Sequence, residues 1–187
     1  MPGPDGFNSN FFQNFWEMIN LEVWQVMEES RANRWMLPSM NSTFITLIPK
    51  EAQSRTPDKF RPIALCNVIY KIVSKVIASR LKPFLPLLIS LEKSGYVEGR
   101  KITDGIILMH KIIHSLKQHK KVGMLLKIDL SKEFDSLSWS YKQKMLTAFG
   151  FSPPWVRWVM SLISSTFFSI LINGILTSPF HSSRGIR

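Results

Sequence analysis

The feature that most constrains the fold is the segment "VGMLLKIDL" at residues 122–130. Its nearly continuous apolar run predicts a β-strand, and a strand that is apolar on both sides is normally covered on both faces. Patterns typical of helices precede and follow this segment along the chain. We therefore expect a mixed α/β (α+β) fold in which helices pack against a sheet.

Helices are predicted where apolar residues recur at three- and four-residue spacing. The first follows a turn at residues 2–6, and its apolar face contains Phe12, Phe15, Trp16, Ile19, Val23 and Met27. Other helices are expected to start at residue 67 and near Thr103 or Asp104, and to cover about 137–149 and 153–165. The segment 42–50 has the composition of a strand, and the polar residues 51–59 are expected to form a loop before "FRPIAL".

Charge is distributed unevenly along the 187 residues. The formal net charge is +11, but residues 1–60 carry −2 and residues 61–187 carry +13. This excess of positive charge in residues 61–187 predicts an anionic partner, with nucleic acid the first candidate and a membrane surface the second. A stripe of Lys71, Lys75, Ser79 and Lys82 is most simply a solvated helix face; its alternative role is to follow a phosphate backbone.

An uncharged stretch from Trp158 to Ser183 is long enough to cross a bilayer, but serine, threonine, asparagine and proline interrupt it. A helix and a hairpin explain it better, because Asn173-Gly174 favours a type I′ turn between two apolar runs. We therefore expect no membrane span and, without a signal peptide at the N-terminus, an intracellular protein of the nucleus or cytoplasm. The single cysteine, Cys66, lies in an apolar run and is expected to be buried.

Asp129 is the candidate functional carboxylate. It lies at the carboxyl end of the predicted strand, where α/β folds commonly place functional groups, although a plain turn residue is an equal alternative. Asp135 is expected to serve as the N-cap of the helix that begins near Leu137. His110 and His114 are spaced for one metal ion, but no further ligands lie near them in the sequence, so a metal role is disfavoured.

Six blocks occur in the order found in one enzyme family: "PGPDGFNSNFFQNFW", "NSTFITLIPK", "FRPIALCNVIYKIVSKVIASRLKPFLPLLIS", "SGYVEGRKITDGI", "LLKIDLSKEFDSLSW" and "FFSILINGILTSPFHSSRGIR". They resemble the reverse transcriptase domain of LINE-type (non-LTR) retrotransposons, especially those of plants. The resemblance implies a right-hand polymerase, with a fingers-like region over about residues 1–120 and the start of the palm over about 121–187.

By the same resemblance, the substrates are an RNA template, a DNA primer and dNTPs, with two Mg²⁺ ions at the intact family site. Asp129 would be the first metal-binding aspartate and the catalytic carboxylate. The implied dNTP-binding residues are Lys50, Arg61 and Phe134, with Phe134 excluding a ribose 2′-hydroxyl. The implied template and primer contacts are Arg100, Arg184 and Gly185.

The chain also departs from the family pattern. Glu133 stands where a small residue is usual, and the resemblance places the paired aspartates of the palm beyond residue 187. Because one carboxylate supplies too few oxygen ligands for two Mg²⁺ ions, we expect a truncated fragment that is inactive by itself. The alternatives are a non-catalytic basic remnant that binds nucleic acid, or an inert product of a decayed element. The unpaired apolar strand is also expected to make the isolated chain poorly soluble.

Overall fold

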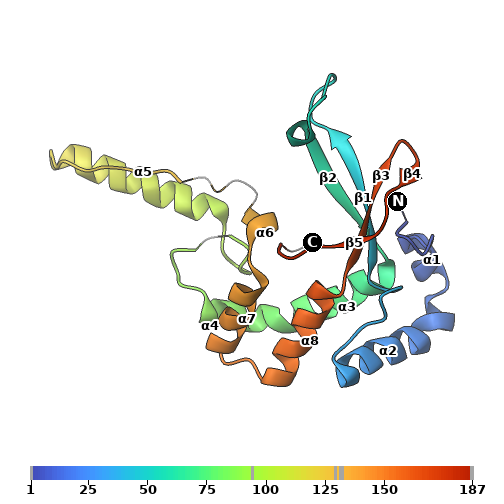
Figure 1. The fold of residues 1–187 in the computed structure, drawn as a ribbon. Coiled ribbons are helices and arrows are strands. Elements are labelled where there is room, and N and C mark those ends of the chain that lie inside the picture. The colour runs from blue at the N-terminus through green and yellow to red at the C-terminus, as the bar shows by residue number, and fades with distance from the viewer. Residues whose placement is uncertain (1, 94, 129, 131–132, 186–187) are drawn as a thin grey trace. The chain divides into compact units, whose positions relative to one another are not determined.

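The structure is a computed structural model that describes residues 2–93, 95–128, 130 and 133–185. The chain divides into two compact units, Met1–Ser74 with Lys132–Arg187 and Lys75–Ser131. Each unit is built from helices, and the first also contains the sheet (Figure 1). The mixed α/β class expected from the sequence is confirmed.

Two helices, rather than the single one expected, follow the N-terminal turn. α1 (Ser9–Asn14) is capped by Asn8, whose side-chain oxygen accepts a hydrogen bond from the Phe11 N–H at 2.9 Å. α2 (Trp16–Asn33) begins after a break at Phe15, so the expected apolar face is divided between the two helices. Phe12 and Val23 are buried together with Val68 in one hydrophobic cluster.

The sheet joins segments far apart in the sequence. Its path runs β2 (Phe60–Cys66), β1 (Ser42–Pro49), β3 (Phe167–Ile172) and β4 (Ile175–Leu176), and β5 (Phe180–His181) also pairs with β3. β1 and β2 form an antiparallel hairpin with a short 3₁₀ helix, η1 (Pro57–Lys59), near its tip. β1 also pairs in parallel with β3, and in that register Thr43 lies beside Phe168.

The hairpin expected at Asn173-Gly174 is confirmed. Both residues have positive φ angles, 50° and 84°, as a type I′ turn requires. Leu171 and Leu176 are register partners on either side of this turn.

Three helices of the first unit lie between residues 133 and 164: α6 (Glu133–Ser136), α7 (Trp139–Ala148) and α8 (Pro153–Ser164). α7 and α8 confirm the two helices expected there. α8 buries Val156, Trp158 and Leu162, and the Trp158 indole donates to Ser30 Oγ of α2 at 3.0 Å. The side chain of Asn41, just before β1, is fully buried and donates to the Leu162 carbonyl at 2.9 Å.

α3 (Val68–Leu81) begins in the first unit and continues into the second. Cys66, the last residue of β2, is buried as expected. Lys71 and Lys75 of α3 and Lys82 beyond it are exposed, which agrees with a solvated stripe. The second unit continues with a 3₁₀ turn, η2 (Lys82–Phe84), and α4 (Leu85–Leu88).

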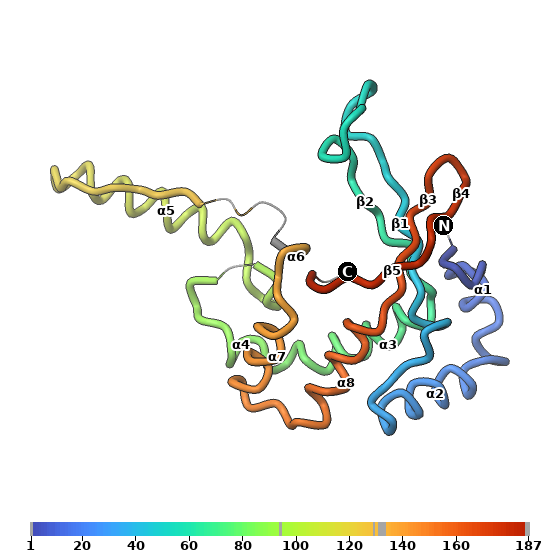
Figure 2. Tube along the Cα trace, in the orientation of Figure 1, coloured from blue at the N-terminus to red at the C-terminus, as the bar shows by residue number. Residues whose placement is uncertain are grey.

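α5 (Ile102–Gln118) starts close to the predicted position. Its cap is Lys101, and Asp104 bonds back to the Lys101 N–H at 3.1 Å instead of occupying the N-cap itself. After α5 the chain reverses and returns beside the helix (Figure 2). A Cβ at Gly123 would lie 2.7 Å from a methyl carbon of Leu116, which shows how closely the returning segment approaches α5.

The strand predicted over residues 122–130 is wrong for the part that the structure describes. Residues 122–128 form neither helix nor strand, and their apolar side chains are exposed, Met124 to 94% and Leu126 to 74%. A strand forms only where a neighbouring strand accepts its backbone hydrogen bonds, and no described residue pairs with this segment. Asp129 itself lies outside the described residues.

Candidate functional site

A groove of about 690 Å³ lies within the first unit. From the β1–β2 hairpin, its lining includes Ile45 and residues 62–64. Asp135 and the C-terminal residues His181 to Gly185 also line it. Tyr70, Ile163, Phe168 and Phe180 complete the lining. The groove lining thus combines apolar residues with residues that carry hydroxyl, imidazole, carboxylate and guanidinium groups.

Gly185 holds one end of this groove in place. Its N–H donates to the Leu137 carbonyl at 2.9 Å, and its own carbonyl accepts hydrogen bonds from the Trp139 indole, at 2.9 Å, and from the Lys142 ammonium. The φ angle of Gly185 is 88°, a conformation that favours glycine. A Cβ there would lie 3.0 Å from the Asp135 carbonyl oxygen. Backbone geometry therefore fixes the approach of Gly185 to α6.

Lys142 is a groove-supporting residue that the sequence analysis missed. It is buried, and burial lowers the pKa of its ammonium group because an apolar environment disfavours the charged form. A signal for burial was present in the sequence: Lys142 follows Trp139 by three residues and precedes Leu146 by four, which places it on the apolar stripe of α7.

The acidic and aromatic residues after Asp129 lie on α6. Asp135 is within this helix and lines the groove, so the prediction that it caps the next helix is wrong; the N-cap of α7 is Ser138. The reason is that a separate short helical turn precedes α7. Phe134 also lies on α6, with 53% of its surface exposed, and is free of the core.

Lys50 and Arg61 lie near the tip of the β1–β2 hairpin. In the antiparallel pairing of β1 with β2, Arg61 is the register partner of Ile48. The Lys50 N–H donates to the Lys59 carbonyl at 2.8 Å. Because side chains alternate along a strand, this register directs Lys50 and Arg61 to the same face of the hairpin. Both are exposed, and neither lines the groove.

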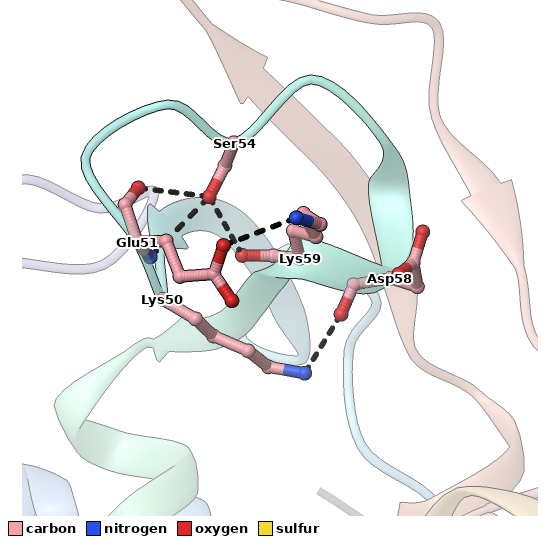
Figure 3. A network of polar contacts seen from close by, with 5 residues as sticks. All are labelled: Lys50, Glu51, Ser54, Asp58 and Lys59. Atoms are coloured by element: carbon pink, nitrogen blue, oxygen red, sulfur yellow. Dashed lines mark hydrogen bonds and ion pairs between the residues drawn. The ribbon is translucent and has the colours of Figure 1, made fainter.

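The hairpin tip is held by its own polar network (Figure 3). Lys50 Nζ donates to the Asp58 carbonyl at 2.7 Å, and Lys59 forms an ion pair with Glu51 at 3.0 Å. Ser54 Oγ donates to the carbonyls of Glu51 and Lys59. These contacts order the turn that carries Lys50, while the ammonium of Lys50 stays at the surface.

Arg100 belongs to the second unit, and its guanidinium organises the loop before α5. It donates to three backbone carbonyls, those of Ser90 at 2.6 Å, Lys93 at 2.8 Å and Ile89 at 3.0 Å. These bonds satisfy carbonyls that follow α4, and Arg100 as a whole is partly exposed. The position therefore has a structural role in addition to the template contact that the resemblance implies.

The described residues do not fit a magnesium centre. No three histidine, cysteine, aspartate or glutamate side chains among them lie close enough together to hold a metal ion. Two Mg²⁺ ions require several oxygen ligands, usually from more than one carboxylate. Asp135 is the described carboxylate at the groove. We therefore derive no chemical step through a metal from these residues.

No helix of the described chain is both long and apolar enough to cross a membrane.

Comparison with known proteins identifies the family. Residues 48–187 match the family model described as reverse transcriptase (RNA-dependent DNA polymerase). The chain is 31% identical over 186 residues to the transposon TX1 uncharacterized 149 kDa protein of Xenopus laevis. The aligned region covers 100% of this chain and 14% of that protein.

Two further relatives come from insects. The chain is 23% identical over 189 residues to a retrovirus-related Pol polyprotein from the type-2 retrotransposable element R2DM of Drosophila melanogaster, covering 100% of this chain and 17% of that polyprotein. A Pol polyprotein from a type-1 retrotransposable element R2 of Popillia japonica is 22% identical over 143 residues, or 76% of this chain and 20% of the relative. The chain thus spans a fifth or less of the length of these relatives. Their retrotransposon origin confirms the expected resemblance, and the match over most of its length shows that the chain belongs to the reverse transcriptase (RNA-dependent DNA polymerase) family.

Proposed function

We propose that the chain forms the fingers-like region, about residues 1–120, and the start of the palm, about residues 121–187, of an RNA-directed DNA polymerase. The observation that carries this proposal is the family match over residues 48–187. In the reaction proposed for the complete site, a primer 3′-hydroxyl attacks the α-phosphate of a dNTP and pyrophosphate leaves. The RNA template selects the incoming base.

The proposed residue roles follow the family motifs. Asp129 is the first metal-binding carboxylate, and Phe134 restricts the sugar to deoxyribose; the exposure of Phe134 on α6 leaves its ring available for that contact. Lys50 and Arg61 bind the triphosphate, a role supported by their position on one face of an ordered hairpin tip. Cations in such positions stabilise phosphate charge as it develops.

Template and primer contacts are proposed for Arg100, Arg184 and Gly185. Arg184 and Gly185 line the groove, and the Gly185 backbone is held by three hydrogen bonds. A rigid backbone segment beside a guanidinium is suited to fixing a phosphate or a sugar edge. Arg100 is partly exposed in addition to making its loop contacts.

We further propose that these 187 residues do not polymerise by themselves. The support is chemical: two-metal phosphoryl transfer needs more than one carboxylate, and the described residues do not gather such a set. Primer extension with the purified chain, an RNA template, a DNA primer, dNTPs and Mg²⁺ is expected to give no product. Incorporation that disappears in Asp129→Asn would overturn this proposal and would establish the role of Asp129.

A further inference from the structure

The second unit carries a concentrated basic surface outside the residues assigned above. Between residues 105 and 128 the sequence contains no aspartate or glutamate. It contains five lysines, which we call the α5 lysines: Lys111, Lys117, Lys120, Lys121 and Lys127. All five are exposed, and none forms an ion pair with a described residue.

Two structural features bring these lysines together. Lys111 and Lys117 lie six residues apart on α5, or about 9 Å along the helix axis at 1.5 Å per residue. The chain then reverses: the Lys121 N–H donates to the Leu116 carbonyl at 2.9 Å, and the contact of Gly123 with Leu116 keeps the returning segment against the helix (Figure 1). The five lysines therefore lie along α5 and along the segment that returns beside it.

From this surface we infer that the α5 lysines bind the phosphate backbone of an RNA–DNA hybrid duplex, independently of its sequence. The charge complementarity is direct, because a duplex is among the most highly charged polyanions and exposed lysines release its counterions on binding. Residues 105–128 contain no phenylalanine, tyrosine or tryptophan, so this stretch offers contacts to phosphates and no aromatic ring of these types on which a base could stack. The inference rests on the proposed polymerase function and adds a contact surface to it.

The test is the salt dependence of binding of a fluorescein-labelled RNA–DNA hybrid to the full chain. Each lysine that neutralises a duplex phosphate contributes about 0.9 to the slope of log affinity against log salt. The triple variant Lys111→Gln, Lys117→Gln and Lys121→Gln should therefore have a slope shallower by about 2.7. Between about 50 and about 200 mM salt, its affinity should fall about 40-fold less than that of the wild type.

The matched control is Arg55→Gln, Lys144→Gln and Arg157→Gln, which removes the same charge from exposed positions of the first unit. Glutamine is a good helix former, and circular dichroism of both variants checks that the helices persist. An equal change of slope in the control would overturn the inference, because it would show a general effect of net charge. An unchanged slope in the α5 variant would overturn it as well.

Two more measurements, hybrid binding by an Arg184→Gln variant and sedimentation with lipid vesicles, separate this inference from its alternatives. If Arg184→Gln weakens hybrid binding and the α5 variant does not, the duplex occupies the groove: the inference then fails and the proposed function stands. If the wild type binds no hybrid at all, both fail. If the α5 substitutions reduce sedimentation with phosphatidylserine vesicles but leave hybrid binding unchanged, the surface is a membrane contact and the inference is wrong.

Discussion

Replacing Gly185 with alanine is expected to destabilise the packing of the segment around Gly185 against α6, at one end of the groove. A side chain at φ 88° carries the penalty of the left-handed region, about 1–2 kcal/mol. The new Cβ would also lie 3.0 Å from the Asp135 carbonyl oxygen and 3.3 Å from its Cα, both of them backbone atoms that cannot rotate away. Forcing that contact adds about 1–2 kcal/mol, so the segment should be destabilised by about 2–4 kcal/mol.

Hydrogen exchange of the Trp139 indole measures this effect directly, because the indole donates to the Gly185 carbonyl at 2.9 Å. Since about 1.4 kcal/mol corresponds to a factor of ten, the indole should exchange roughly 30-fold faster or more, up to the unprotected rate. Gly174→Ala is the matched control. Its φ angle is 84°, but a Cβ there meets nothing within 4 Å, so it carries the backbone penalty alone and leaves the Trp139 indole protected.

The reasoning is refuted if Gly185→Ala leaves the indole exchange rate unchanged. It is also refuted if Gly174→Ala accelerates that exchange to the same extent, because the effect would then not depend on the contact with Asp135.

Two further predictions concern buried polar side chains. Lys142→Met should stabilise the chain by about 1 kcal/mol near neutral pH, because relief from burying an ammonium outweighs one lost hydrogen bond. The folded-state pKa of Lys142 is below its ordinary value of 10.5, so the unfolded state binds more protons between the two values, and wild-type stability rises with pH in that window. The stability difference between Lys142→Met and the wild type should therefore shrink as the pH approaches 10.5. Urea denaturation at several pH values tests this, with substitution of the exposed Lys144 by Met as the control. A stability difference that stays constant or grows with pH would contradict it. Asn41→Leu should cost about 3 kcal/mol in urea denaturation, because it removes the buried amide that donates to the Leu162 carbonyl and to Ser165 Oγ, the latter at 2.7 Å; a loss below about 1 kcal/mol would exclude this role.

Features set by neighbouring residues were predictable from the sequence. The turn at Asn173-Gly174 was predicted correctly because positive φ angles are an intrinsic preference of that pair, and α8 because its apolar periodicity lies within one segment. The family was also identifiable, since six motifs in order constrain each other more than any one of them does.

The tertiary structure decided what depends on distant partners. Residues 122–128 have the composition of a strand but lack a described neighbour to pair with, so composition alone misassigned them. The parallel pairing of β1 with β3 joins residues more than a hundred positions apart, and no local pattern encodes it. The same holds at the groove, where Lys142 is buried because the Gly185 carbonyl meets its ammonium, and where Gly185 is required because Asp135 lies against it. Local backbone preferences act within a few residues, whereas burial, register and close approach are set by chain segments that only folding brings together.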